Sequence, residues 1–304
     1  MARPLLECVP NFSEGRNPAT LAALRQAITS VPGLALLAQE ADTDHNRSVF
    51  TFAGSPEAVL EASFRAVAAA RDHIDLRHHT GVHPRIGAAD VVPLVPLQNV
   101  SLEQCAAFAH KLGQRIARSL GIPVYFYEAA ALRPERQRLE VVRRSGFEAL
   151  RELTLHDPSR MPDAGGPALH PSAGATAVGA RKFLLAFNIN LDTADVAIAQ
   201  QIARKVRASS GGLPHVKAMG VFLASRGLAQ VSMNLTDFEV TPLAVVYEAV
   251  REEAARLGAS IVGSEFIGLV PAKAIGQAAS VYLKAETRPE DQILERRLLI
   301  DLID

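Results

Sequence analysis

The sequence has a formal net charge of zero and contains no long apolar run. Its 32 lysine and arginine residues are matched by 32 aspartate and glutamate residues, so it lacks the excess positive charge of a general nucleic-acid or anionic-membrane binder. Its longest apolar stretches, such as residues 91–97, are short and interrupted by proline, whereas a membrane-spanning helix needs about 20 apolar residues. We therefore expect no nucleic-acid and no membrane partner, and we expect any bound anion to be held locally.

Cysteine is also scarce. Only Cys8 and Cys105 occur, both on faces predicted to be buried, which fits a reducing compartment better than a disulfide framework. The first residues, Met-Ala-Arg-Pro-Leu-Leu-Glu-Cys, lack the apolar core and small-residue cleavage site of a secretory signal. The sequence therefore predicts a cytoplasmic protein.

Apolar material is plentiful, and it predicts two folded units. The chain has 304 residues, of which 48% are hydrophobic and 21% charged, which excludes a disordered protein and suits two domains. Capping patterns place helix starts at Pro18, Pro56 and Ser101. In the second half, strands are expected near residues 183–191, 216–223, 228–235 and 260–262, with helices near 193–209 and 241–257. We predict an α+β fold with a duplicated β-α-β-β-α-β unit and domains at residues 1–180 and 181–304.

The segment between the halves, residues 158–179, is rich in Gly, Pro, Ala and Ser and shows no periodicity. This composition predicts a linker, a functional loop, or both. Small residues from Ser172 to Arg181 would let the backbone approach a flat ligand closely. The run lacks the Gly-Lys-Ser/Thr ending of a phosphate-binding loop and precedes its strand, so nucleotide binding is disfavoured.

Four histidines, His73, His78, His79 and His83, cluster after the second predicted helix. The spacing of His79 and His83 would suit a metal only on a helix, yet Gly81 and Pro84 predict a loop. We therefore predict no metal site. General acid/base catalysis is the alternative, because imidazole titrates near neutral pH. His83 is the preferred residue, since Pro84 restricts its backbone and Arg85 places a cation nearby. A group of surface or capping histidines remains the competing interpretation.

Other polar groups are candidates for ligand binding. The run Asp42-Thr-Asp-His-Asn-Arg-Ser is either a hydrophilic turn or, through Arg47, a carboxylate clamp, for which Arg85 and Arg181 are further candidates. Asn188 and Asn190 in one predicted strand, and Gln230, Ser232 and Asn234 in another, alternate with apolar residues. That alternation predicts either a solvated sheet face or the polar wall of a ligand cleft, and amides rather than charges favour the cleft.

Several blocks of this sequence resemble the glutamate formiminotransferase family, also called the glutamate formimidoyltransferase family. The blocks are Glu7-Cys-Val-Pro-Asn-Phe-Ser-Glu-Gly-Arg-Asn, His45-Asn-Arg-Ser-Val-Phe-Thr-Phe-Ala-Gly, His83-Pro-Arg-Ile-Gly-Ala, Pro123-Val-Tyr-Phe-Tyr-Glu-Ala-Ala, Gly174-Ala-Thr-Ala-Val-Gly-Ala-Arg-Lys-Phe-Leu-Leu-Ala-Phe-Asn-Ile-Asn-Leu and Gly263-Ser-Glu-Phe-Ile-Gly-Leu-Val-Pro. They run in order over nearly the whole chain.

The resemblance implies two ferredoxin-like subdomains forming α/β sandwiches, with a ligand tunnel between them, in a homodimer. It implies transfer of a formimino group between N-formimino-L-glutamate and N5 of tetrahydrofolate in histidine degradation, with tetrahydrofolate as a substrate and no metal. It also implies that His83 is the catalytic acid/base. Implied folate contacts are Gly165, Gly166, Pro167, Ser172 and Gly174. Candidate substrate-binding residues are Glu40, Asp42, Asn46, Arg47, Arg85, Arg181, Asn188, Asn190 and Asn234.

Some positions depart from the family pattern. Pro162-Asp-Ala-Gly-Gly-Pro replaces the more usual Pro-Asp-Phe-Gly-Pro, so the loop is expected to be re-spaced. Glu40 stands where an aspartate assisting the histidine is expected, and Asp42 is the alternative for that role. No sequence follows residue 304 for a cyclodeaminase domain, so we expect the single-activity form. Two other functions stay open: transfer of a formyl group between 5-formyltetrahydrofolate and glutamate, and a non-catalytic ferredoxin-like ligand-binding protein.

Overall fold

The computed structural model describes residues 3–43, 45–81, 84–224 and 226–284. The chain divides into two compact units, Met1–Lys182 and Phe183–Asp304, and each has its own sheet and its own apolar core. The predicted α+β fold with two subdomains is confirmed at this level. None of the described helices is both long and apolar enough to cross a lipid bilayer.

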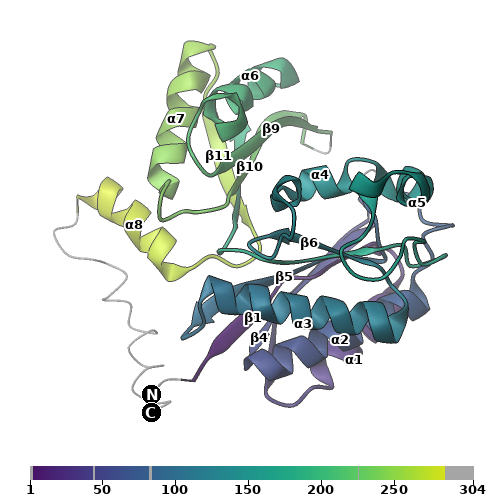
Figure 1. Cartoon of the computed structure of the whole chain (residues 1–304). Helices are drawn as coiled ribbons and strands as arrows, with labels where there is room; N and C mark the ends of the chain where they lie inside the picture. The colour runs from purple at the N-terminus through teal and green to yellow at the C-terminus, as the bar shows by residue number, and fades with distance from the viewer. Residues whose placement is uncertain (1–2, 44, 82–83, 225, 285–304) are drawn as a thin grey trace. The chain divides into compact units, whose positions relative to one another are not determined.

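The first unit is built on a seven-stranded sheet in the order β1-β4-β2-β5-β7-β6, with β3 paired to β4. Its strands are β1 (Leu5–Cys8), β2 (Asn11–Phe12), β3 (Leu34–Asp42), β4 (Arg47–Gly54), β5 (Ala89–Gln98), β6 (Val124–Glu128) and β7 (Thr176–Ala180). Its helices are α1 (Pro18–Thr29), α2 (Pro56–His73), α3 (Leu102–Leu120), α4 (Leu139–Arg143) and α5 (Gly146–His156), with short 3-10 turns η1 (Pro134–Gln137) and η2 (Pro158–Arg160). Helices α1, α2 and α3 lie along one side of this sheet, and α4 and α5 lie on the other (Figure 1).

Local sequence signals fix the starts of the long helices. The Asn17 side chain accepts hydrogen bonds from Ala19 N (3.0 Å) and Thr20 N (3.4 Å) at the start of α1. The Ser55 hydroxyl caps α2. Ser101 and Gln104 form a reciprocal capping box on α3, and such caps satisfy backbone donors that a helix leaves unpaired. These predicted helix starts are confirmed.

The face of the first sheet that α1, α2 and α3 cover carries a large part of the unit's apolar core. Leu6, Cys8, Phe50 and Phe52 are fully buried there, and Cys105 of α3 belongs to the same core. Both cysteines are buried and are free thiols. Their burial confirms the prediction that they lie on buried faces.

Strand β5 was not predicted, because Pro93 and Pro96 interrupt its sequence. A proline cannot donate a ladder hydrogen bond, which usually confines it to sheet edges. Here β5 is central and pairs with β1, β2 and β7. Pro93 nevertheless takes part in the sheet through its carbonyl, which accepts from Val9 N at 3.4 Å.

Strand β7 corrects the prediction for residues 158–179, which are not merely a linker. Residues Thr176–Ala180 form a buried strand that pairs in parallel with both β5 and β6. A Cβ on Gly179 would lie 2.4 Å from the ring of Tyr127, so the small residues that obscured the strand in the sequence make room for the aromatic side chain of β6. The segment therefore completes the first sheet.

The second unit contains β8 (Leu185–Leu191), α6 (Val196–Val206), a 3-10 turn η3 (Ala208–Ser210), β9 (Val216–Leu223), β10 (Leu228–Leu235), α7 (Leu243–Arg256), β11 (Ile261–Ile267) and α8 (Ala272–Leu283). Its strands pair antiparallel in the order β11-β8-β10-β9. Helices α6 and α7 lie together on one side of this sheet (Figure 1). Phe187, Ile189, Val231 and Met233 are buried in the core beneath them, which confirms the predicted alternation and leaves Asn188, Asn190 and Gln230 on the opposite face.

Candidate functional site

A narrow pocket in the first unit gathers residues from distant parts of the chain. It encloses only about 10 Å³. It is lined by the β2 segment, the turn between β3 and β4, the histidine-rich loop and the start of β5, through Phe12, Ser13, His45, Asn46, Arg47, His79, Arg85 and Asp90. The predicted binding residues Asn46, Arg47 and Arg85 are therefore neighbours in space.

His83, the predicted catalytic residue, lies outside the described residues, but its described flanks are attached to this pocket. Asn46 Nδ2 donates to the carbonyl of Thr80 at 3.0 Å. His79 Nε2 lies 3.0 Å from the Asn46 carbonyl, and Arg85 Nη2 donates to the His79 carbonyl at 3.1 Å. The described chain is thus held on both sides of His83.

Asn46 connects two loops of the pocket through hydrogen bonds of its side chain. Its backbone has a φ of 48°, a left-handed conformation that asparagine adopts more readily than most residues. Its Oδ1 accepts from Gly15 N at 3.0 Å, while its Nδ2 binds the histidine-rich loop. Both ends of this side-chain amide are therefore committed to backbone groups, and its evident role is to position loops.

Arg85 and His79, on the histidine-rich loop, each have a further interaction. Arg85 forms an ion pair with Glu148 of α5 at 2.8 Å. Burial lowers the pKa of His79, an effect larger than the opposing one of its hydrogen bond to Asn46. Burial therefore makes the protonated form of His79 less favourable than that of a solvent-exposed imidazole.

Two guanidinium groups meet one buried aspartate at the base of the pocket. Asp90 Oδ1 accepts from Ile86 N at 2.8 Å, and its Oδ2 lies 3.2 Å from Nε of Arg143, the last residue of α4. Burial, followed by repulsion from Arg143, lowers the pKa of Arg47 to about 10. The negative charges of Asp90 and Asp42 act in the opposite direction on Arg47.

The predicted acidic assistants, Glu40 and Asp42, are not among the residues that line the pocket. Glu40 is exposed on β3. Asp42, at the end of the same strand, binds His45 Nδ1 at 2.9 Å and also accepts from the His45 backbone N at 2.8 Å. Of the two carboxylates, Asp42 is the one attached to a residue that lines the pocket.

Arg181 is separate from this pocket and is associated with a buried carboxylate of β1. Glu7 is 3% exposed, and its Oε2 has no hydrogen-bond partner among the described residues. Burial raises the pKa of Glu7 to about 7, although the charge of Arg181 acts in the opposite direction. The Glu7 side chain therefore titrates near neutral pH in the folded protein.

This raised pKa predicts a pH-dependent loss of stability. A carboxyl whose pKa is raised on folding contributes stability below its unfolded pKa near 4.5 and loses that contribution as pH rises through about 7. We expect Glu7→Gln to be more stable than the wild type by about 3 kcal/mol at pH 8, with the difference shrinking toward pH 5. Urea unfolding across this range measures the effect, with exposed Glu152→Gln as the control. Parallel pH profiles for wild type and Glu7→Gln would contradict it.

The polar face of the second sheet carries a connected side-chain network. Gln230 Nε2 lies 2.8 Å from both Asn190 Oδ1 and Glu265 Oε1, and Asn188 Nδ2 donates to the same Glu265 oxygen at 3.3 Å. Asn188, Asn190 and Gln230 are buried, whereas Asn234 is exposed and outside the network. Strands β8, β10 and β11 thus present amides and one carboxylate as a preorganised polar surface.

The predicted folate loop adjoins the histidine-rich loop. The Ser172 carbonyl accepts from Leu76 N at 2.8 Å. Gly174 has a φ of 70°, and a Cβ there would lie 2.2 Å from the Ile86 carbonyl, so only glycine fits. The loop therefore packs against the chain on both sides of the segment that contains His83.

The start of that loop is anchored to β6. Ala164 O accepts from Val124 N at 2.8 Å, and Asp163 Oδ2 accepts from Phe126 N at 2.9 Å. Asp163 also forms a buried ion pair with Arg136. Gly165, Gly166 and Pro167 follow directly, with a cis bond between Gly166 and Pro167.

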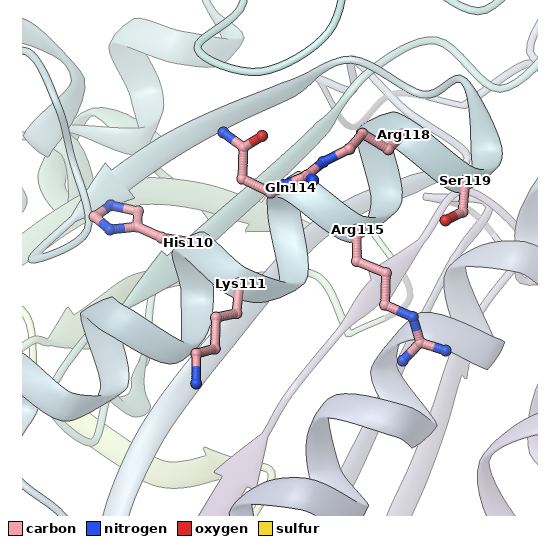
Figure 2. A pocket seen from close by; sticks show the side chains of 6 residues that line it. All are labelled: His110, Lys111, Gln114, Arg115, Arg118 and Ser119. Carbon is pink, nitrogen blue, oxygen red and sulfur yellow. The ribbon is translucent and has the colours of Figure 1, made fainter.

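A larger and more open pocket, of about 500 Å³, lies along α3 (Figure 2). Its lining comes from successive turns of this helix: His110, Lys111, Gln114, Arg115, Arg118 and Ser119. Arg115 is paired with Glu61 at 2.7 Å, and His110 Nε2 lies 2.8 Å from the Ala130 carbonyl. None of the predicted site residues lines this pocket, so we place the candidate site at the smaller one.

No group of three or more His, Cys, Asp or Glu side chains is placed to hold a metal ion within the described ranges.

Comparisons with known proteins match both units of the chain. A family described as "Formiminotransferase domain, N-terminal subdomain" matches residues 5–181, and one described as "Formiminotransferase domain" matches residues 186–302. This chain belongs to the formiminotransferase family. Its relatives include a glutamate formimidoyltransferase of Streptococcus pyogenes serotype M1, 46% identical over 97% of this chain and 99% of the relative. A glutamate formimidoyltransferase of Thermoplasma acidophilum is 45% identical, with 97% of both chains covered.

A formimidoyltransferase-cyclodeaminase of Gallus gallus is 46% identical over 93% of this chain, but over only 53% of that longer relative. The formiminotransferase resemblance predicted from the sequence blocks is thereby confirmed.

Sequence reasoning missed several residues in or beside the first unit's pocket, and one on the second sheet. Asp90 of β5 pairs with Arg143 of α4, and Glu148 of α5 pairs with Arg85. Each pair joins segments that are far apart in the sequence, and no local motif marks Asp90, Arg143 or Glu148. Glu265 stood in a quoted family block, yet only the strand pairing brings it beside Asn188 and Gln230. In each case the missing signal was the pairing of distant segments.

Proposed function

We propose that this chain is a glutamate formimidoyltransferase that transfers a formimino group between N-formimino-L-glutamate and N5 of tetrahydrofolate. The observation that carries the proposal is the match, at 45 and 46% identity and over nearly the whole length of both chains, to relatives bearing that name. The pocket of the first unit supplies chemistry that suits it: cations for carboxylates, and a histidine-bearing loop held on both sides.

The reaction needs one bond to form, one to break and a proton to change places. N5 of tetrahydrofolate attacks the amidine carbon to give a tetrahedral intermediate, and the bond from that carbon to the glutamate nitrogen then breaks. The attacking N5 loses a proton, and the departing nitrogen gains one. We assign this proton transfer to His83, a role worth typically 10²–10⁴ in rate. Holding the two substrates in register contributes a further share.

The finer features of the family complete the proposal. They comprise ferredoxin-like folding of both units, a folate tunnel between them, a homodimer and a cytoplasmic location. The strand order β11-β8-β10-β9, with helices after the first and third strands of the unit, supports the ferredoxin-like assignment of the second unit. We assign the pterin edge to the amide network of Asn188 and Asn190, and folate contacts to the loop that runs through Gly165, Gly166, Pro167, Ser172 and Gly174.

The donor assay separates this function from its alternatives. We expect kcat/KM for formiminoglutamate with tetrahydrofolate to exceed that for 5-formyltetrahydrofolate with glutamate by at least about tenfold, because the transferred formimino and formyl groups differ in one hydrogen-bonding group. A reversed ratio would indicate a formyltransferase, and folate binding without turnover of either pair would indicate a binding protein.

Arg47→Ala tests the carboxylate assignment. We expect KM for formiminoglutamate to rise about 10- to 100-fold, since a charge-assisted hydrogen bond contributes about 1.5–3 kcal/mol. Steady-state kinetics measure it, with Arg25→Ala, an exposed arginine of α1, as the matched control. If neither KM changes, Arg47 belongs only to its turn.

A further inference from the structure

We propose that His170 is a positioning residue whose neutral imidazole closes the predicted folate loop, so that folate affinity falls when this ring takes up a proton. The inference rests on the proposed function, because that function assigns folate to the loop. His170 is not among the site residues that the sequence predicts, and its part in the loop follows from the hydrogen bonds of the structure.

The first argument is the hydrogen bond that the His170 ring accepts. Ala173 N donates to His170 Nδ1 at 3.1 Å. Because a backbone N–H only donates, Nδ1 carries a lone pair and the ring is neutral, with its proton on Nε2. A protonated imidazole has an N–H at both nitrogens. This hydrogen bond is therefore lost when His170 takes up a proton.

The second argument is the turn that this hydrogen bond closes. His170 N donates to the Gly174 carbonyl at 3.0 Å, and Gly174 N donates to the His170 carbonyl at 2.9 Å. Ser172, an implied folate contact, lies inside this turn, and Gly174, another such contact, ends it. The Ala173 N–H lies between them in the chain. Its bond to the imidazole therefore acts on the part of the loop that is assigned to folate.

The third argument is that His170 is the titratable group of this turn. Within residues 170–174 it alone has a titratable side chain. The backbone bonds that attach the turn to the rest of the unit do not titrate, and they include the bond of 2.8 Å from Leu76 N to the Ser172 carbonyl. Protonation therefore removes one specific bond of the turn and leaves its backbone bonds to carry the closure.

The surroundings of the ring give the direction of the pH effect. Burial, followed by the charge of Arg71, lowers the pKa of His170, whereas Asp72 acts in the opposite direction. Both charged side chains come from α2, where they pair at 2.8 Å, and within the described part of the chain they are the charges that act on this ring. An imidazole in the open loop titrates near its usual pKa of about 6.5. The closed turn is therefore most stable above that pH and loses stability as pH falls below it.

Two substitutions separate the hydrogen bond from the proton. His170→Asn keeps an acceptor that does not titrate, because an asparagine side chain commonly accepts from a backbone N–H two or three residues ahead. His170→Ala removes the acceptor. At pH 8 we expect Kd for 5-formyltetrahydrofolate, used as a stable folate, to be about 3- to 10-fold higher in His170→Ala than in the wild type. In His170→Asn it should stay near the wild-type value.

A pH profile distinguishes closure by the neutral ring from a merely structural role. We expect the ratio of the wild-type Kd to that of His170→Asn to rise from about one at pH 8 to about 3–10 at pH 5. The ratio cancels the titration of groups that both proteins share. His156→Asn, which replaces an exposed histidine of α5, should keep the wild-type profile. A ratio that stays constant from pH 8 to pH 5 would overturn the proposal.

Amide hydrogen exchange in the absence of folate separates this inference from the proposed function. We expect the protection of the Ala173 N–H in the wild type, relative to that in His170→Asn, to fall about 3- to 10-fold between pH 8 and pH 5. Such a fall in a protein that binds no folate at any pH would refute the folate function and support closure of the turn by His170. Normal turnover and folate binding without such a fall would leave the function standing and refute the role of His170.

Discussion

Replacing His83 by alanine is expected to lower kcat by about 10²–10⁴-fold, while the Kd for folate stays near the wild-type value. The proton can no longer pass from N5 of tetrahydrofolate to the departing nitrogen by way of an imidazole. Folate binding should persist, because Asn46, His79 and Arg85 hold the flanking chain. Turnover assays give kcat, and titration with 5-formyltetrahydrofolate as a stable ligand gives Kd.

The matched control for this variant is His78→Ala, because His78 is exposed in the same histidine cluster. It should retain wild-type kcat. Added imidazole should restore part of the activity of His83→Ala. It should restore none of the activity that the protein loses on heating. A near-normal kcat in His83→Ala would contradict the assignment of proton transfer to His83, and it would leave the description of the fold unchanged.

Replacing Arg136 by alanine is expected to cost about 3–5 kcal/mol of unfolding free energy, the range for removing one partner of a buried ion pair. Arg136 and Asp163 are each almost fully buried. Arg136 also donates to the carbonyls of Ser159 and Met161. The truncation leaves the buried Asp163 carboxylate with only the more distant Arg133, whose Nε lies 3.9 Å from Oδ1. Urea unfolding measures the loss.

Arg138→Ala is the control for Arg136→Ala. The side chain of Arg138 is 64% exposed and pairs with Glu140 at the surface, where an ion pair contributes at most about 1 kcal/mol. Because Asp163 directly precedes the loop at Gly165, we also expect folate affinity to fall in Arg136→Ala. Equal stability of the two variants would show that the buried pair does not hold this segment.

Much of the fold could be predicted from local sequence signals. The caps at Asn17, Ser55 and Ser101 depend on residues within one helical turn, and the alternation in β8 and β10 depends on neighbours along a strand. Strand β5 was missed because prolines obscure it, and β7 because small residues give no periodicity. Both strands owe their stability to pairing with distant partners, which a local pattern does not encode.

The candidate site was predictable only in part for the same reason. Arg47 and Arg85 belong to motifs that can be recognised along the chain, and the structure brings them to one pocket. Arg181 has the same chemistry but is associated with Glu7 elsewhere on the first sheet. Residue type therefore identified candidates, and strand order decided which of them meet. Asp90 and Arg143 show the converse, since their association depends wholly on tertiary packing.

The central claim is that this chain moves an intact formimino group from glutamate nitrogen to a folate nitrogen. Incubating the purified protein with tetrahydrofolate and formiminoglutamate labelled with ¹³C at the formimino carbon tests it directly by NMR. We predict that the label appears on N5 of tetrahydrofolate as an equal amount of unlabelled glutamate is released. Label that stays on glutamate nitrogen, or that is lost only to hydrolysis at the rate seen without protein, would contradict the account.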